Sequence, residues 1–133
     1  MRPKTESDFR EPTEVERALL ARLLEADFPG RSELVPLVGS VRVRTIDEDG
    51  GLELKTQGEG IAPVVQRVPV EAEGKDEDGV IIHMLLHVID GRPSELEFFR
   101  EDAGTVKRLP LPSAFDLIVL PSMPTGGWLR HKS

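Results

Sequence analysis

The chain has 133 residues, a length typical of one domain, and it carries a net charge of −7 with a pI near 5.0. It has no cysteine, which excludes disulfides, thiolate catalysis, iron–sulfur clusters and zinc ribbons. The acidic charge and the lack of a basic run exclude nucleic acid and argue against an anionic membrane as partner. The first residues are charged and no apolar run reaches about 18 residues, so we expect neither a signal peptide nor a membrane span and place the protein in the cytoplasm.

Two helices are predicted in the N-terminal third of the chain. The first lies in PTEVERALLARLLEADFPG, where Thr13 and Glu16 form a capping box and the Phe-Pro-Gly triplet ends the helix. Its apolar residues recur at helical spacing and are expected to form one buried stripe: Val15, Leu19, Leu20, Leu23, Leu24 and Phe28. A short second helix is predicted in RSELVPLVG, with Ser32 as its N-cap and Gly39 as its end.

From residue 41 the apolar period changes from that of a helix to that of a strand. Strands are expected in the following stretches: VRVRTI, LELKT, VVQRVPVEAE, VIIHMLLHVI, SELEFFRED and FDLIVL. This order predicts an α+β fold, in which two N-terminal helices pack on a curved, mainly antiparallel β-sheet of about five to six strands. We expect residues 1–12 to be a flexible N-terminal segment, 13–120 a single α+β domain and 121–133 a Pro/Gly-rich C-terminal tail.

The motif HMLLH places His83 and His87 four residues apart. On a helix the two side chains would share a face and could chelate a metal ion, as in zincin helices. The β-branched residues and turns around the motif favour a strand instead. Residues four apart on a strand lie about 13 Å from each other, too far to share one ion. We therefore expect no metal site and no cofactor.

The loop after this strand decides which residues accompany the histidines. A two-residue loop at Asp90 and Gly91 would put the histidines on the face of the apolar residues of the next strand. A three-residue loop with Gly91 in the left-handed conformation and a bulge would unite the apolar residues on one face. We expect the second register, because it buries that set. The opposite face then carries His83, Leu85, His87, Glu95, Glu97 and Phe99.

That second face supplies the candidate site residues. His83 is the candidate general base and Glu97 its orienting partner, because a carboxylate raises the pKa of an imidazole and fixes its tautomer. His87, Glu95 and Phe99 are candidates for binding. The structural alternative is polar pairing between strands on a half-solvated face.

Trp128 could anchor a partner, or it could fold back to cover an open sheet face. The DEDG stretches at 47–50 and 76–79 lack the ligands that an EF-hand requires and are predicted to be hairpin turns. No dinucleotide fingerprint, phosphate loop or Gly-x-Ser-x-Gly motif is present.

The combination of ERALLARLLEADFPG, VPVEAEGKDEDG, LLHVIDGRPSELEFFRED and RLPLP resembles a family of small, uncharacterised bacterial proteins known only as a domain of unknown function. The likeness extends from Thr13 to Leu117 and rests on the end of the first helix, the Asp-Gly hairpin and the Glu-Leu-Glu strand. It implies a single globular unit and no particular reaction.

Together these observations favour a non-enzymatic protein-interaction module. Strands that look apolar on both faces in so short a chain indicate that the histidine face meets a protein partner or a second copy, as a homodimer. The alternative is a small-molecule binder or small enzyme that uses the pair of His83 and Glu97. A third hypothesis is an inhibitor-type protein whose negative surface covers a basic target.

Overall fold

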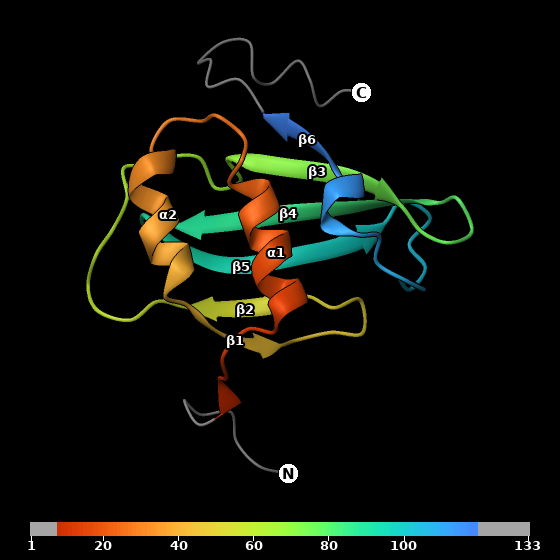
Figure 1. Cartoon of the computed structure of the whole chain (residues 1–133), viewed down its shortest axis with the longest axis horizontal. Coiled ribbons are helices and arrows are strands. Elements are labelled where there is room, and N and C mark those ends of the chain that lie inside the picture. Colours follow the sequence, from red (N-terminus) through yellow and green to blue (C-terminus); the bar gives the residue numbers. More distant parts are fainter. Residues whose placement is uncertain (1–7, 120–133) are drawn as a thin grey trace.

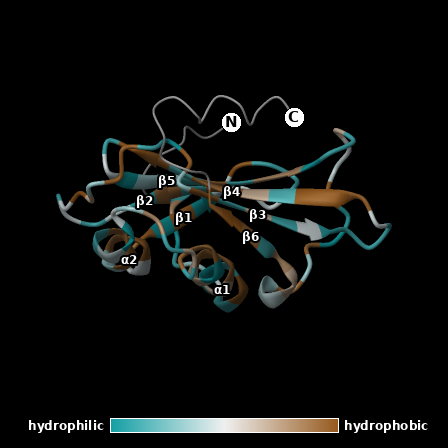
Figure 2. Ribbon diagram, turned by 90° about the horizontal axis from the view of Figure 1, so that it is seen from above, coloured by the Kyte–Doolittle hydropathy of each residue, from teal (hydrophilic) through white to brown (hydrophobic). Residues whose placement is uncertain are grey.

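The computed structural model describes residues 8–119, in which two helices lie on one face of a six-stranded sheet (Figures 1 and 2). The elements are α1 (Glu14–Leu23), α2 (Arg31–Gly39), β1 (Arg42–Thr45), β2 (Leu52–Lys55), β3 (Val70–Lys75), β4 (Ile81–Ile89), β5 (Arg92–Arg100), the short 3₁₀ helix η2 (Pro112–Ala114) and β6 (Asp116–Val119). The predicted α+β class is confirmed. Within this part of the chain, no helix has the length and apolar character that crossing a membrane requires.

Helix α1 begins at the predicted capping box. The Thr13 hydroxyl accepts a hydrogen bond from the Glu16 backbone N–H (3.1 Å), and the Glu16 carboxylate accepts one from the Thr13 N–H (2.8 Å). The helix ends at Leu23, so two residues of the predicted stripe, at positions 24 and 28, enter the core from the following loop. Val15, in the first turn, is 60% exposed, and its predicted place in the buried stripe is wrong.

Helix α2 begins two positions earlier than predicted. Its N-cap is Gly30 and not Ser32, and Gly39 is its last residue, as expected. Gly30 has a φ of 87°, and a Cβ there would lie 2.6 Å from Cγ2 of Val64 and 2.8 Å from the carbonyl oxygen of Pro63. Both the left-handed backbone and the close approach of the loop therefore require glycine.

The strands form one antiparallel sheet in the order β1-β2-β5-β4-β3-β6. Strands β3, β4 and β5 make a central meander, the β1–β2 hairpin lies beside β5, and β6 lies beside β3. Both DEDG stretches are hairpin turns, as predicted. Arg10, inside the segment expected to be flexible, pairs with Val43 in an isolated bridge on the outer side of β1.

The β4–β5 hairpin has the predicted faces, but not for the predicted reason. Met84 lies opposite Phe98, and His83 lies opposite Phe99, so the apolar set shares one face. The loop has two residues, Asp90 and Gly91, both with positive φ (53° and 77°), as tight hairpin turns require. Beyond the turn, between the His87 and Val88 pairings, the register shifts by one residue of β5, and this bulge restores the alignment that the short turn alone would lose.

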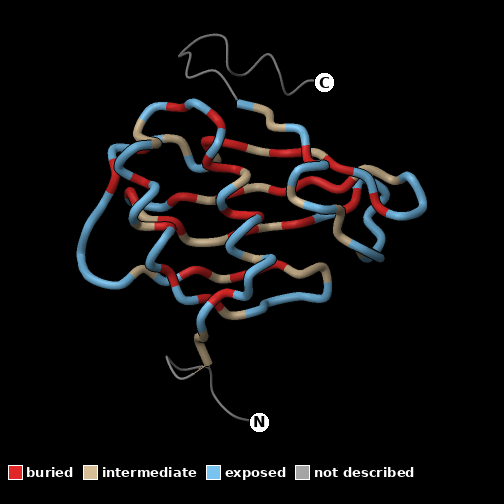
Figure 3. The backbone as a smooth tube through the Cα atoms, viewed as in Figure 1, coloured by how far each residue is buried: buried red, intermediate tan, exposed pale blue. Residues whose placement is uncertain are grey.

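The core lies between the helices and the sheet. Buried and less buried positions alternate along the central strands (Figure 3). The sheet contributes Ile82, Met84, Leu86 and Leu96, all with no exposed surface. Leucines of α1 and α2 complete the same cluster from the other side. Helix packing thus uses only one face of the sheet.

A buried ion pair joins the β3–β4 turn to β5 and to the chain that follows it. The Asp76 carboxylate, fully buried, lies 2.9 Å from the Arg100 guanidinium, which also contacts Asp78 and Asp102. Asp76 accepts further hydrogen bonds from the backbone N–H groups of residues 107–108, at 2.7 and 2.8 Å. Burial alone would raise the pKa of Asp76, but the hydrogen bonds from this backbone and from Arg100 hold the pKa well below its usual value.

Candidate functional site

The face of the sheet opposite α1 and α2 is the candidate site. No helix in residues 8–119 covers it (Figure 2). We call it the open face and define it by side chains that lie opposite one another on β1 to β5 and by the residue after β5: Arg42, Arg44, Glu53, Lys55, Glu71, Glu73, Lys75, Ile81, His83, Leu85, His87, Glu95, Glu97, Phe99 and Glu101. Apolar residues are few on this face. The strands were expected to be apolar on both faces, but only the face toward the helices is apolar.

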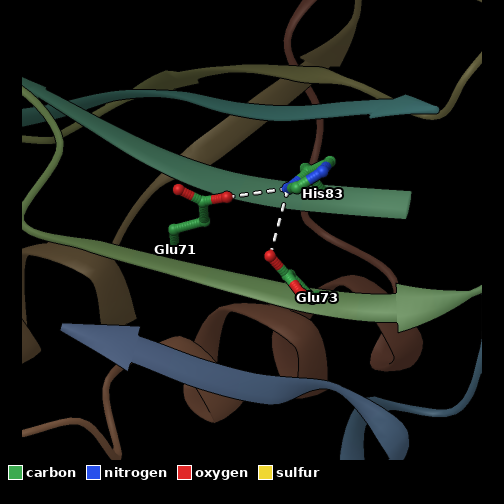
Figure 4. Close-up of side chains that lie close together, drawn as sticks. All are labelled: Glu71, Glu73 and His83. Atoms are coloured by element: carbon green, nitrogen blue, oxygen red, sulfur yellow. Dashed lines mark hydrogen bonds and ion pairs between the residues drawn. The ribbon is translucent and has the colours of Figure 1, made fainter. Parts of the chain in front are cut away.

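His83 lies at the centre of the first polar cluster (Figure 4). Its Nδ1 atom is 2.7 Å from Oε2 of Glu71 and 3.9 Å from Oε2 of Glu73, both on β3. Its Nε2 atom is 2.8 Å from Oε2 of Glu101, the residue after β5. The ring stacks on Phe99, with centroids 4.7 Å apart and planes 17° apart. Three strands thus fix both the position and the plane of the imidazole.

The carboxylates around His83 also set its protonation. Partial burial would lower the pKa of His83, but the hydrogen bonds to Glu101 and Glu71, with the charges of Glu71 and Glu73, raise the pKa above its ordinary value. A carboxylate accepts hydrogen bonds and cannot donate them, so the imidazolium alone donates to both neighbours at once. In this protonated state neither ring nitrogen has a lone pair for a third group.

His87 occupies a different polar cluster on the same strand. Its Nε2 atom lies 2.7 Å from Oε1 of Glu97, and the Nε–H of Arg67 donates a hydrogen bond of 3.2 Å to Nδ1. Because Nδ1 accepts, the ring proton must sit on Nε2 and point at Glu97. Glu95 lies directly opposite His87 on β5. The positively charged guanidinium of Arg67 therefore lies beside this cluster.

The structure brings the predicted residues onto one face but changes their pairing. The predicted contact between His83 and Glu97 is wrong, because Glu97 lies opposite Leu85 and its carboxylate bonds to His87. Phe99 contacts His83, as described above. Trp128 lies outside the described residues.

Sequence reasoning missed the partners that come from outside the β4–β5 hairpin. These are Glu71 and Glu73 on β3, Glu101 just after β5, and Arg67 in the loop before β3. The alternation in VPVEAE was a usable signal for Glu71 and Glu73 sharing a face. Nothing in the sequence indicates that this face is also that of His83.

Two groups of side chains on the open face have the composition of metal sites. Glu71, Glu73 and His83 form one group, and the other consists of His87, Glu95 and Glu97. In each group the three potential ligand atoms lie within 4.8 Å of one another. The two histidines belong to different groups, in line with their predicted separation on a strand. The expectation of no metal site rested on the separation of the two histidines and on the DEDG stretches, and it did not consider the carboxylates of β3.

Three hollows in the surface lie away from the histidines. One of about 540 Å³ is next to the β4–β5 turn, one of about 230 Å³ is between α1 and α2, and one of about 350 Å³ is beside β6. Neither His83 nor His87 lines any of the three. What the histidines offer is an extended surface bearing two polar clusters.

Comparison with known proteins gives a family and no activity. The model of a domain of unknown function, DUF6984, matches residues 9–110. No curated protein and no solved structure shows significant similarity to the chain. The chemistry of the open face must therefore be read from its own residues.

Proposed function

The chain belongs to the DUF6984 family, a domain of unknown function, and from its surface we propose that it is a protein-interaction module whose open face binds a positively charged segment of a partner. One observation carries this proposal: five glutamates surround the two histidines at the centre of a sheet face that no helix of residues 8–119 covers, and the lysines and arginines of that face lie on β1, on β2 or at the end of β3. An extended charged surface recognises a partner of opposite charge and steers its approach.

The negative charge of this face is concentrated on its central strands. Glu53, near the β1 edge, is in an ion pair with Arg44. The ion pairs of Glu71, Glu73, Glu97 and Glu101 are with the two histidines, His83 and His87. Lysine or arginine side chains of a partner would complement this cluster of carboxylates.

The same charge argues against the homodimer that the sequence left open. Two copies meeting through their open faces would set carboxylates against carboxylates, and like charges brought together at an interface cost several kcal/mol. A partner of opposite sign avoids this cost. The proposal thus combines the interaction module and the basic target expected from the sequence.

The alternative, a small enzyme or small-molecule binder, receives less support from the geometry. A general base needs a nitrogen that can reach the substrate proton. Both ring nitrogens of His83 face carboxylates, and those of His87 face Arg67 and Glu97. Neither ring lines one of the three hollows.

A capture experiment with three baits tests the proposal. The native chain, the face variant Glu95→Lys/Glu97→Lys and the control variant Glu48→Lys/Glu77→Lys are each incubated with extract of the native host. The control makes the same charge change in two exposed turns. We expect a protein that the native and control baits capture and the face variant does not, and whose affinity for the purified chain falls as salt is added.

Two results would overturn the proposal. One is a stoichiometric partner captured equally by the native chain and by the face variant. The other is sedimentation of the native chain as a dimer that the face variant breaks, because the open face would then be an interface between copies. Circular dichroism of all three baits shows whether a lost interaction reflects the surface or the fold.

A further inference from the structure

We propose that Glu71, Glu73 and His83 form a binding site for one divalent transition-metal ion of the zinc type, with Glu101 positioning the histidine ring. This inference does not depend on the partner-binding role, since it concerns one cluster of the open face and has its own readout. Imidazole nitrogen with carboxylate oxygens is a donor set that suits zinc and its neighbours better than magnesium or calcium.

The ligand atoms converge on one ring nitrogen. Oε2 of Glu71 and Oε2 of Glu73 lie 2.7 and 3.9 Å from Nδ1 of His83, and both point toward that atom in Figure 4. Tetrahedral zinc with bonds near 2.0 to 2.2 Å holds its ligand atoms about 3.3 Å apart. The two oxygens bracket that spacing. Small rotations of two glutamate side chains, which are 20% and 39% exposed, would bring both to it.

The second ring nitrogen is engaged as metal-binding histidines require. A ligating histidine usually donates its other N–H to a carboxylate, which fixes the tautomer and strengthens the metal bond. Here Glu101 lies 2.8 Å from Nε2 of His83 and would accept a hydrogen bond from its N–H, which leaves the Nδ1 lone pair facing Glu71 and Glu73. The stack on Phe99 holds the plane of the ring. This arrangement is more than an acidic cluster, because it orients a neutral donor at the point where the acids meet.

Charge favours an ion at the same place. Glu71, Glu73 and Glu101 surround a single imidazole, so the cluster stays negative even when His83 is protonated. A divalent ion on Nδ1 would replace the ring proton and neutralise both ligating carboxylates. His83 and Glu71 are mostly buried, at 11% and 20% exposure of their side chains, so the surrounding water compensates this charge only in part.

The other group on the open face lacks the features that favour an ion. Nδ1 of His87 accepts a hydrogen bond from Arg67, whose positive charge would repel a metal ion. Its Nε2–H points at Glu97, so no lone pair of the ring faces the carboxylates. His87 is therefore a matched control: the same residue type, on the same strand and face, in a cluster of similar composition.

Isothermal titration calorimetry of the metal-stripped full chain with Zn²⁺ tests the site, at mildly alkaline pH so that protons compete little for the imidazole. The same titration is run with His83→Gln, His87→Gln and Glu101→Gln, and with Mg²⁺ in place of Zn²⁺. We expect one equivalent of zinc in the native chain and in His87→Gln, and loss of that equivalent in His83→Gln. Glu101→Gln should weaken binding by about 10- to 100-fold, because it keeps the ligands and replaces the charged acceptor that orients the ring with a neutral amide.

The outcomes separate a built site from zinc on an acidic surface. Absence of zinc binding by the native chain, binding that survives His83→Gln, or equal loss in His83→Gln and His87→Gln would each overturn the proposal. Nitrogen NMR of the imidazole rings gives a second readout: zinc should shift Nδ1 of His83 and leave His87 unchanged. If His83→Gln does not fold by circular dichroism, that readout in the native chain decides, and no shift at His83 rejects the site.

Discussion

At the residue scale, identical side chains acquire different chemistry from their neighbours. His83 and His87 share a strand and a face, yet the first is enclosed by carboxylates on both ring nitrogens and the second accepts a hydrogen bond from Arg67. The partners, and not the histidines, distinguish a cluster that can exchange its ring proton for a metal ion from one that cannot. The same holds for aspartates: Asp76 is a turn residue by sequence and a buried hydrogen-bond acceptor by structure.

Asp76→Asn is expected to lower thermal stability. It should also make thermal stability fall less steeply as the pH is lowered. The pKa of Asp76 lies well below its usual value in the folded chain, so the folded state binds this proton less readily than the unfolded state. Its contribution is complete above the unfolded pKa of about 4 and is lost as the pH falls toward the folded pKa. Thermal unfolding followed by circular dichroism, from neutral pH to about pH 3, measures both effects.

Asp78→Asn is the matched control for this prediction. Asp78 contacts the same arginine, but its side chain is 36% exposed, whereas that of Asp76 is fully buried. Removing one partner of a buried ion pair leaves the other unpaired, while an exposed pair contributes little. Parallel acid-unfolding profiles for the native chain and Asp76→Asn would contradict the assignment.

At the element scale, neighbouring residues of β4 point alternately into the core and onto the open face. Leu86→Ala removes a side chain with no exposed surface and should lower the free energy of unfolding by about 2–5 kcal/mol. Leu85→Ala changes the neighbouring residue on the open face and should cost about 1 kcal/mol or less. Urea unfolding of the two variants measures the difference. Similar losses would mean that the open face is covered by a packed layer.

Local patterns predicted most elements, and long-range contacts account for what they missed. The capping box at Thr13 indicated where α1 begins, and the apolar spacing in β4 and β5 indicated their common buried face. The end of α1 was missed, because Leu24 and Phe28 are buried just as helical residues would be while lying in a loop. Apolar spacing indicates which residues are buried, but it does not indicate whether a helix or a loop carries them.

The candidate site was predictable only within one hairpin. Cross-strand neighbours on β4 and β5 followed from the register, so the open face and its histidines were found. Glu71 reaches His83 because β3 lies on the other side of β4, and the sequence pattern does not specify strand order. Arg67 and Glu101 lie outside the strands, where no periodicity applies. The metal cluster therefore appears only in three dimensions.

At the scale of the whole molecule, a single layer of helices stabilises a sheet whose other face is polar. Strands β4 and β5 have nine residues each and a neighbour on both sides, whereas β6 has four residues and one neighbour. The central pair should open only when the whole domain unfolds, and the short edge strand should open locally.

Hydrogen exchange followed by NMR should therefore show graded protection. We expect the backbone amides of Met84 and Leu86 to exchange last and those of Leu117 to exchange orders of magnitude faster, since local opening costs less than global unfolding. Equal protection of β6 and β4 would mean that the sheet opens as one unit. Adding Zn²⁺ should slow exchange around His83 if the metal site forms.

The bulge in β5 makes the fold sensitive to the number of residues in the β4–β5 hairpin, and the amino-acid composition does not reveal this. With a two-residue turn, the one extra residue of β5 is all that keeps Glu95 and Glu97 on the side of the histidines. Deleting Ser94 would reverse the parity of everything after it, turning two glutamates toward the helices and Leu96 and Phe98 toward water. Insertions and deletions between His87 and Glu95 should thus be tolerated only in even numbers. Whether the number of residues in this hairpin is even or odd, more than the identity of any one side chain, keeps the polar and apolar side chains on opposite faces of the sheet.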